Sequence, residues 1–165
     1  VTLKPKMLHE MENQINESIK LMGIKDLNNF PTFVIGANND LGGALGVYKP
    51  ITNVLYISSD TLKRKAFAEY LKESKGAISA NRLSTMIHEL FHWKDAQKYI
   101  KRYGALTDQS RYIKKLCEQD EKKIDQLKAK GYNLYKISVY ATRQLIMGRY
   151  DEVFTEYRTK ILLKV

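Results

Sequence analysis

Apolar residues near the start of the chain recur at the spacing of a helix. Between residues 6 and 23 they lie three or four positions apart, so they share one helical face. These residues are Met7, Met11, Ile15, Ile19 and Met22. An Asn-Asn pair and then Pro31 interrupt the pattern, because both residue types favour turns. The pattern therefore predicts an amphipathic helix over residues 6–23.

The segment that follows has the composition of short strands. Residues 32–35, 44–48 and 53–57 are rich in β-branched and aromatic residues. Turn-forming sequences separate them, namely GANNDLGG at 36–43 and the Lys49-Pro50 pair. Such alternation predicts a small antiparallel or mixed sheet.

The rest of the chain has helical periodicity. The pattern begins after Ser59-Asp60, which suits a helix N-cap, and predicts helices over 60–75, 80–102, 108–130, 133–147 and 149–163. Glycines at 76, 104, 131 and 148 fall at the proposed ends, where a left-handed conformation is common. One helix, then a sheet, then several helices predicts an α+β fold, with residues 1–165 as a single domain.

Composition narrows the class of protein. There is no apolar run long enough for a membrane span. Cys117 is the single cysteine, so an intrachain disulfide or a multi-cysteine zinc site is excluded. The sequence starts at Val1 without the apolar core of a signal peptide. The single thiol leaves the compartment open, because cytosolic proteins and many secreted bacterial proteins alike lack disulfides.

The chain is strongly basic. Its 28 basic and 18 acidic residues give a net charge of +10, which favours anionic partners such as acidic substrates or nucleic acid. The lysines are spread along the predicted helices, as on a solvated face, and no nucleic-acid-binding motif accompanies them. Nucleic acid is therefore the least favoured partner.

One pentapeptide carries the clearest chemistry. Residues 88–92 read His-Glu-Leu-Phe-His, and two histidines at i and i+4 lie one above the other on a helix. His88 and His92 are thus placed to bind one zinc ion together. Glu89 points aside, where it can take a proton from a water that the metal activates.

A catalytic zinc needs a third protein ligand, and several residues compete for that position. His9 is the remaining histidine, on the first predicted helix. Asp95 lies a further turn along from His92 and is better placed as a structural carboxylate. Glu152 and Glu156 stand at i and i+4 on the last predicted helix. One of these glutamates could complete the site while the other orients a ligand histidine, or both could be solvated.

This motif and two later segments resemble the anthrax lethal factor-like metallopeptidases. Residues 88–95 fit the pattern HExxHxxD, while 139–141 (Val-Tyr-Ala) and 152–156 (Glu-Val-Phe-Thr-Glu) are similar to the Y-A and E-x-F-A-E elements of that group. The group includes lethal factor's catalytic domain, secreted Pro-Pro endopeptidases and related phage or mobile-element domains. Thr155 replaces the usual alanine. Tyr140 precedes Glu152 by a longer gap than usual.

The resemblance implies a zincin-like fold and a zinc endopeptidase of the gluzincin type, with one Zn²⁺ per chain. His88, His92 and Glu152 would bind the metal, and Glu89 would act as general base. The resemblance further implies a peptide or protein substrate.

The same resemblance implies roles for residues that do not bind the metal. Glu156 would orient a ligand histidine, Asp95 would be structural, and Tyr140 would donate a hydrogen bond to the developing oxyanion. Three further tyrosines compete with Tyr140 for that role. They are Tyr132, Tyr135 and Tyr150.

Zincins also pair an extended substrate with an edge strand near the active site. The best candidate for this strand is residues 43–48, whose glycines allow a close approach of backbones; an ordinary hairpin strand is the alternative. The candidate residues are Gly43, Ala44, Leu45, Gly46, Val47 and Tyr48.

A different class of function fits the same motif. A structural or interaction domain, such as part of a phage or mobile-element protein, could keep the zincin fold without catalysis. The presence of Glu89 favours the peptidase, because a purely structural zinc site does not require a general base.

Overall fold

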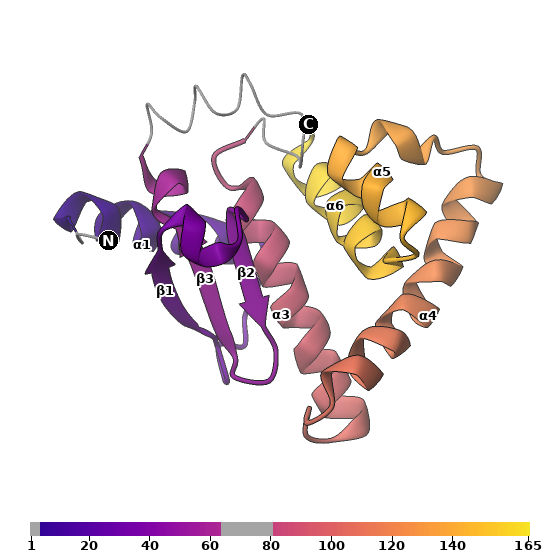
Figure 1. Cartoon of the computed structure of the whole chain (residues 1–165), viewed down its shortest axis with the longest axis horizontal. Coiled ribbons are helices and arrows are strands. Elements are labelled where there is room, and N and C mark those ends of the chain that lie inside the picture. The colour runs from indigo at the N-terminus through magenta and orange to yellow at the C-terminus, as the bar shows by residue number, and fades with distance from the viewer. Residues whose placement is uncertain (1–3, 64–80) are drawn as a thin grey trace.

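The computed structural model describes residues 4–63 and 81–165, and these form an α+β fold. Five α-helices accompany three strands in this part of the chain (Figure 1). The helices are α1 Pro5–Met22, α3 Ser84–Tyr103, α4 Gln109–Ala129, α5 Val139–Ile146 and α6 Tyr150–Leu163. The strands are β1 Thr32–Gly36, β2 Gly46–Lys49 and β3 Val54–Ser58. The helix expected over 60–75 lies mostly outside the described residues, and its described start is a 3-10 turn, Ser59–Leu62.

The sheet is mixed, with strand order β1-β3-β2. β2 pairs antiparallel with β3, whereas β1 pairs parallel with β3. A purely antiparallel sheet was therefore the wrong alternative, because the chain passes from β1 to the far edge before it returns through a tight turn into β3. This path leaves β2 on an edge of the sheet.

β2 begins later than its composition predicts. Gly42 and Gly43 have φ values of 63° and 83°, a left-handed conformation that turns the chain instead of extending it. The predicted strand at 44–48 is therefore observed at Gly46–Lys49, and residues 43–45 belong to the approach to it. Leu45 still pairs with the sheet, since its carbonyl accepts from the Ser58 N–H at 2.8 Å.

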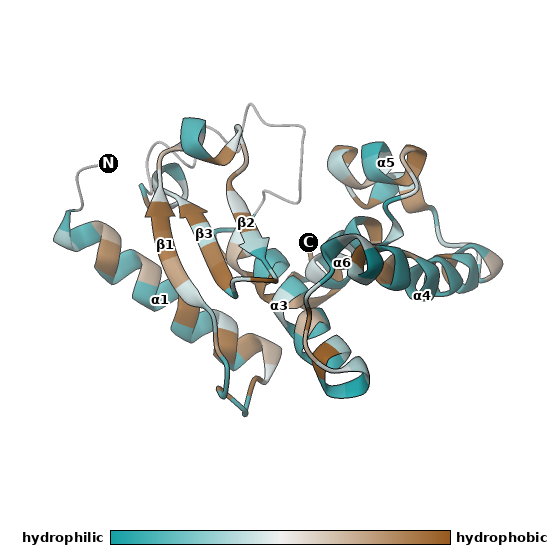
Figure 2. Ribbon diagram, turned by 60° about the horizontal axis from the view of Figure 1, so that its bottom comes forward, coloured by the Kyte–Doolittle hydropathy of each residue, from teal (hydrophilic) through white to brown (hydrophobic). Residues whose placement is uncertain are grey.

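Two apolar clusters hold the elements together. The larger joins α1, the sheet and α3, with Leu55, Ile57, Met86 and Leu90 fully buried. The smaller joins the distal part of α4 to α5 and α6 around Ile124. Figure 2 shows α1 crossing one face of the sheet. Helix α4 takes part in both clusters, because its first turns contribute Tyr112 and Leu116 to the larger one.

The helix predicted over 133–147 is interrupted. A 3-10 turn, Leu134–Lys136, is followed by an extended Ser138 (φ −167°, ψ 165°), and α5 starts at the next residue. The Ser138 hydroxyl accepts from the Ala141 N–H at 2.9 Å, which makes it an N-cap and explains the break. Helix periodicity does not detect a cap inside a continuous polar and apolar pattern.

Candidate metal centre

The His-Glu-Leu-Phe-His motif lies on α3 where this helix packs against α6. Met86, Ile87 and Leu90 are fully buried in the body of the protein. This anchors one face of α3 and turns the histidines toward α6. The contact brings together residues that are 60 or more positions apart in the chain. The cluster therefore forms only when the last helix docks.

Three side chains converge at this contact. His88 Nε2 lies 3.0 Å from His92 Nε2, and Glu152 Oε2 lies 3.1 Å and 3.2 Å from these two nitrogens. Among the described residues, this is the group of His, Cys, Asp or Glu whose ligand atoms all lie within 4.8 Å. Two imidazoles and one carboxylate are a donor set that suits zinc.

Glu156 occupies the other side of His88. Its Oε1 lies 2.6 Å from His88 Nδ1, and the residue is 1% exposed. A carboxylate only accepts, so this contact holds the proton on Nδ1 and leaves Nε2 to face His92 and Glu152. The alternative that both glutamates of α6 are solvated is wrong.

The glutamates and histidines of the cluster favour each other's ionised forms. Burial alone would lower the pKa of His88, but hydrogen bonds to Glu152 and Glu156 outweigh it and raise that pKa well above its ordinary value. For Glu152, burial would raise the pKa, but His92 and His88 hold it well below the usual range. The carboxylate of Glu152 is thus ionised at neutral pH, as a metal ligand must be.

Glu89 sits next to these groups without joining them. It is 8% exposed, and its Oε2 accepts from the backbone N–H of Tyr48 at 2.8 Å. Burial raises the pKa of Glu89 despite the opposing effect of His88 and His92. A carboxylate with a raised pKa is better matched to moving a proton near neutral pH.

Tyr140 is the tyrosine that reaches the cluster. Its hydroxyl donates to Glu152 Oε2 at 3.1 Å. Burial and the negative charge of Glu152 raise the pKa of Tyr140, so its hydroxyl stays protonated. The three competitors lie elsewhere: Tyr135 is 69% exposed, while Tyr132 and Tyr150 pack against the smaller apolar cluster.

The two remaining candidates, Asp95 and His9, lie outside the ligand group. Asp95 is 8% exposed and accepts two hydrogen bonds from Arg158, at 2.9 and 2.7 Å. This pair ties α3 to α6, in keeping with the structural role expected for Asp95. His9 is exposed on α1 and does not belong to the metal-ligating group found among the described residues.

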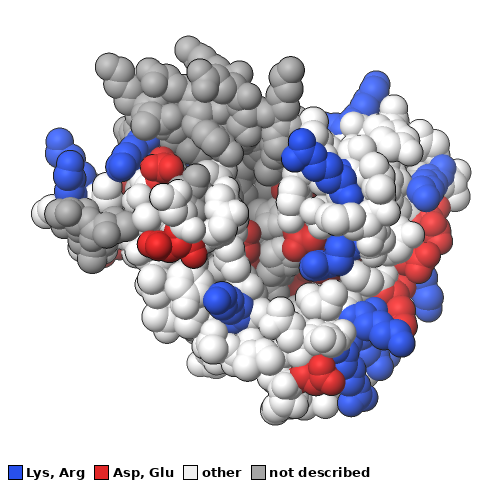
Figure 3. Space-filling view, in the orientation of Figure 1, with Lys and Arg blue, Asp and Glu red and all other residues white. Residues whose placement is uncertain are grey.

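A cleft of about 250 Å³ leads to the cluster. β2 forms one wall through Gly46, Val47 and Tyr48, together with the preceding Ala44, and α4 contributes Tyr112 and Leu116 to its lining. Acidic side chains are visible in the hollow between the sheet and α6 (Figure 3). An edge strand therefore does border the cleft, although whether it pairs with a substrate stays a prediction.

Two close contacts near the cleft do not follow from the motif spacing. A Cβ placed on Gly46 would lie 2.8 Å from Thr85 Cγ2 and 2.9 Å from Glu89 Cγ, so β2 approaches α3 at a distance that glycine alone permits. Ser138 donates to Glu156 Oε2 at 2.8 Å. Its position as a serine ahead of a helical segment was the signal that could have identified it.

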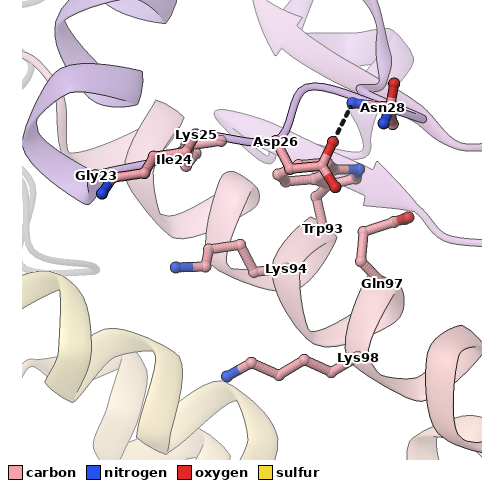
Figure 4. A pocket seen from close by; sticks show the side chains of 9 residues that line it. All are labelled: Gly23, Ile24, Lys25, Asp26, Asn28, Trp93, Lys94, Gln97 and Lys98. Atoms are coloured by element: carbon pink, nitrogen blue, oxygen red, sulfur yellow. Dashed lines mark hydrogen bonds between the residues drawn. The ribbon is translucent and has the colours of Figure 1, made fainter.

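Another hollow, of about 280 Å³, lies between α3 and the segment that follows α1 (Figure 4). Lys94 and Lys98 extend from α3 in the same direction, and Asp26 accepts from the Asn28 N–H at 2.9 Å. Burial, with the nearby Lys98 and Arg158, lowers the pKa of Lys94. This hollow contains none of the candidate metal ligands, so the candidate chemistry belongs to the cleft.

Comparisons of the chain with protein-family models, with curated proteins and with solved structures found no match. None of the helices in the described ranges has the length and apolar composition needed to cross a membrane. The geometry of the cleft and the sequence motifs are therefore the observations that bear on function.

Proposed function

We propose that the chain is a zinc-dependent endopeptidase of the zincin type. The observation that carries this proposal is the convergence of His88 Nε2, His92 Nε2 and Glu152 Oε2, all within 3.2 Å of one another. The resemblance of residues 88–95, 139–141 and 152–156 to the lethal factor-like metallopeptidases supports the same function. A sheet with an edge strand beside the motif helix is compatible with a zincin-like fold.

His88, His92 and Glu152 would hold one Zn²⁺ ion. Zinc at such a site lowers the pKa of a water and polarises a carbonyl group. Glu89 accepts a proton from the attacking water and delivers it to the amine that leaves when the peptide bond breaks. The Tyr140 hydroxyl donates to the oxyanion that develops on the carbonyl oxygen. Glu156 keeps His88 oriented throughout.

The substrate would be a peptide or protein chain that enters along β2. An edge strand offers backbone N–H and C=O groups to an extended segment. β2 combines this edge position with a place in the wall of the cleft. We therefore place the scissile bond between β2 and the metal-ligating group.

The first experiment measures the metal content of the purified full chain by inductively coupled plasma mass spectrometry. We expect about one zinc per chain, since a site with three protein ligands holds a single ion. Glu152→Ala should lose or greatly weaken that binding. Glu121→Ala, an exposed glutamate on α4, serves as the matched control and should keep it.

A second variant separates binding from catalysis. Glu89→Gln should retain zinc but lose hydrolysis of a peptide library that the wild-type chain cleaves. Failure of the wild-type chain to take up zinc after reconstitution at neutral pH would overturn the proposal. Hydrolysis that persists in Glu89→Gln would overturn the assigned base.

A further inference from the structure

One hydroxyl group beside the cleft joins helix α5 to helix α6. Ser138 Oγ donates to Glu156 Oε2 at 2.8 Å and accepts from the Ala141 N–H at 2.9 Å. A serine hydroxyl has one proton to donate and lone pairs that accept, so both contacts form at once. The same side chain therefore caps α5 and binds a carboxylate of α6.

The contact between Ser138 and Glu156 is connected to His88 through the Glu156 carboxylate. Glu156 is 1% exposed, and its two oxygens contact different elements: Oε1 lies 2.6 Å from His88 Nδ1 on α3, while Oε2 receives the Ser138 proton. The orientation of this carboxylate decides the direction of the His88 ring. Ser138 is thus one hydrogen bond removed from a group that sets the ring of a proposed metal ligand.

The contact between Ser138 and the Ala141 N–H affects the position of Tyr140. This residue lies in the first turn of α5, two positions after Ser138, and its hydroxyl donates to Glu152 Oε2 at 3.1 Å. Because an N-cap fixes the backbone of the first turn, Ser138 also determines where the Tyr140 side chain starts. The Thr142 hydroxyl adds a further tie, since it donates to the Ser138 carbonyl at 3.1 Å.

We propose that Ser138 is a positioning residue that holds His88 and Tyr140 in a fixed relation to each other. The inference rests on the proposed function, because it assumes that His88 binds zinc. It assigns to one hydroxyl the coupling between a metal ligand on α3 and the oxyanion donor on α5. A role as helix cap alone would affect α5 without reaching His88.

The experiment uses three substitutions in the full chain that separate these roles. Ser138→Ala removes both contacts. Ser138→Asp keeps an acceptor for the Ala141 N–H but cannot donate, and it adds a negative charge beside Glu156. Ser138→Thr keeps both functions. Asp108→Ala is the matched control, because Asp108 caps α4 through a bond of 3.1 Å to the Arg111 N–H and does not contact the ligand cluster.

Zinc affinity is measured by competition with a chromogenic chelator, and the unfolding of the metal-free chain is measured in parallel. Residues that orient metal ligands typically change affinity by about 10- to 100-fold when removed, and we expect a loss in this range for Ser138→Ala and Ser138→Asp. Ser138→Thr should bind zinc like the wild-type chain. Asp108→Ala should lose stability without losing zinc affinity.

The cobalt-substituted protein gives a readout that loss of helix stability does not explain. Its visible absorption bands depend on ligand geometry, so they should shift in Ser138→Ala and Ser138→Asp but not in Asp108→Ala. Unchanged zinc affinity in Ser138→Ala and Ser138→Asp would overturn the inference while leaving the peptidase proposal intact. A wild-type chain that binds no zinc would overturn both.

Discussion

At the scale of single residues, the cleft keeps the proposed metal ligands apart from the proposed general base. His88, His92 and Glu152 face one point, whereas Glu89 is held aside by the Tyr48 N–H. The spacing of the motif was enough to predict that His88 and His92 face the same point and that Glu89 points aside. It could not decide between Glu152 and Glu156, because residues at i and i+4 share a helix face and only the docking of α6 distinguishes them.

Removing the hydroxyl of Tyr140 should affect turnover more than metal binding. We expect Tyr140→Phe to keep its zinc and to lower kcat by about 100-fold, the usual effect of losing one oxyanion donor. Steady-state kinetics on a peptide that the wild-type chain cleaves would measure the effect. Tyr135→Phe is the control, since Tyr135 is 69% exposed. Equal kcat in the two variants would exclude Tyr140 from the reaction.

The pKa shifts predict that pH changes the stability of the metal-free chain and the extra stability given by zinc in opposite directions. Without metal, the raised pKa values of His88 and His92 contribute stability that is complete below about pH 6.5 and is lost as pH rises through their folded values. The lowered pKa of Glu152 contributes stability that is present above about pH 4.5 and is lost as pH falls.

Zinc would bind the neutral imidazoles of His88 and His92, so its binding should strengthen as pH rises and these side chains lose their protons. The increase in Tm caused by zinc should therefore be larger at pH 8 than at pH 5.5, while the Tm of the metal-free chain changes in the other direction. Thermal unfolding at both pH values, with zinc and with chelator, measures this directly. An equal zinc-induced shift at the two pH values would contradict the assignment of the histidines as ligands.

At the scale of elements, the approach of β2 to α3 depends on one glycine. In Gly46→Ala the new methyl group would collide with Thr85 and Glu89, which are under 3 Å away. We expect β2 to shift and the Tyr48 N–H to lose Glu89. Overpacking of this kind lowers the free energy of unfolding by about 1–3 kcal/mol, and hydrolysis should fall further than zinc affinity.

Gly36→Ala provides the control for that substitution. The added methyl group would lie 3.5 Å from Leu41 Cδ2, an ordinary contact on another strand of the same sheet. Urea unfolding and turnover of both variants make the comparison. If Gly46→Ala behaves like Gly36→Ala in both measurements, close packing of β2 is not what positions Glu89.

The contact between α3 and α6 also depends on the pair of Asp95 and Arg158. The Arg158 guanidinium lies 4.6 Å from the centre of the Phe91 ring and 4.8 Å from that of Phe154, so it is enclosed by both helices. Asp95→Ala would leave this cation without its carboxylate. The pair is partly buried, with side-chain exposures of 16% for Arg158 and 10% for Asp95. We therefore expect the free energy of unfolding to fall by more than the about 1 kcal/mol of an exposed pair but by less than the about 3–5 kcal/mol of a fully buried one.

Chemical denaturation measures that loss, with Asp60→Ala as the control. Asp60 lies 3.9 Å from Lys63 in an exposed pair, and exposed pairs contribute about 1 kcal/mol or less. A similar small loss in both variants would mean that the α3–α6 contact does not depend on Asp95.

At the scale of the whole molecule, the proposed ligands come from the two parts of the protein that the two apolar clusters hold together. His88 and His92 belong to the helix that packs on the sheet, and Glu152 belongs to the group of α5 and α6 (Figure 1). Zinc would therefore link the two apolar clusters. At about 100 times its dissociation constant, a bound ion adds about 2.7 kcal/mol to stability.

Removal of zinc by a chelator should accordingly lower the Tm of the wild-type chain. Differential scanning calorimetry with and without chelator gives the comparison. The Tm of Glu152→Ala should not respond to chelator, because the ligand set is incomplete in that variant. A Tm that is insensitive to chelator in the zinc-loaded wild-type chain would contradict a link between the clusters.

The fold features that the sequence predicts are those that depend on local periodicity, and the features that it misses depend on contacts between distant segments. The α+β class and most helix positions follow from local periodicity. The parallel pairing of β1 with β3 does not, because strand order depends on contacts between distant segments. The contact of Ser138 with Glu156 does not follow from local periodicity either, because it joins residues 18 positions apart.

Helix α4 gives the molecule a property that neither apolar cluster has alone. Its first turns contribute to the cluster around the sheet and its last turns to the cluster around Ile124. Neither cluster can melt without disturbing a helix that the other needs, so the two are expected to unfold in one cooperative transition. The amide protons in the middle of α4 would then exchange with solvent only through global opening.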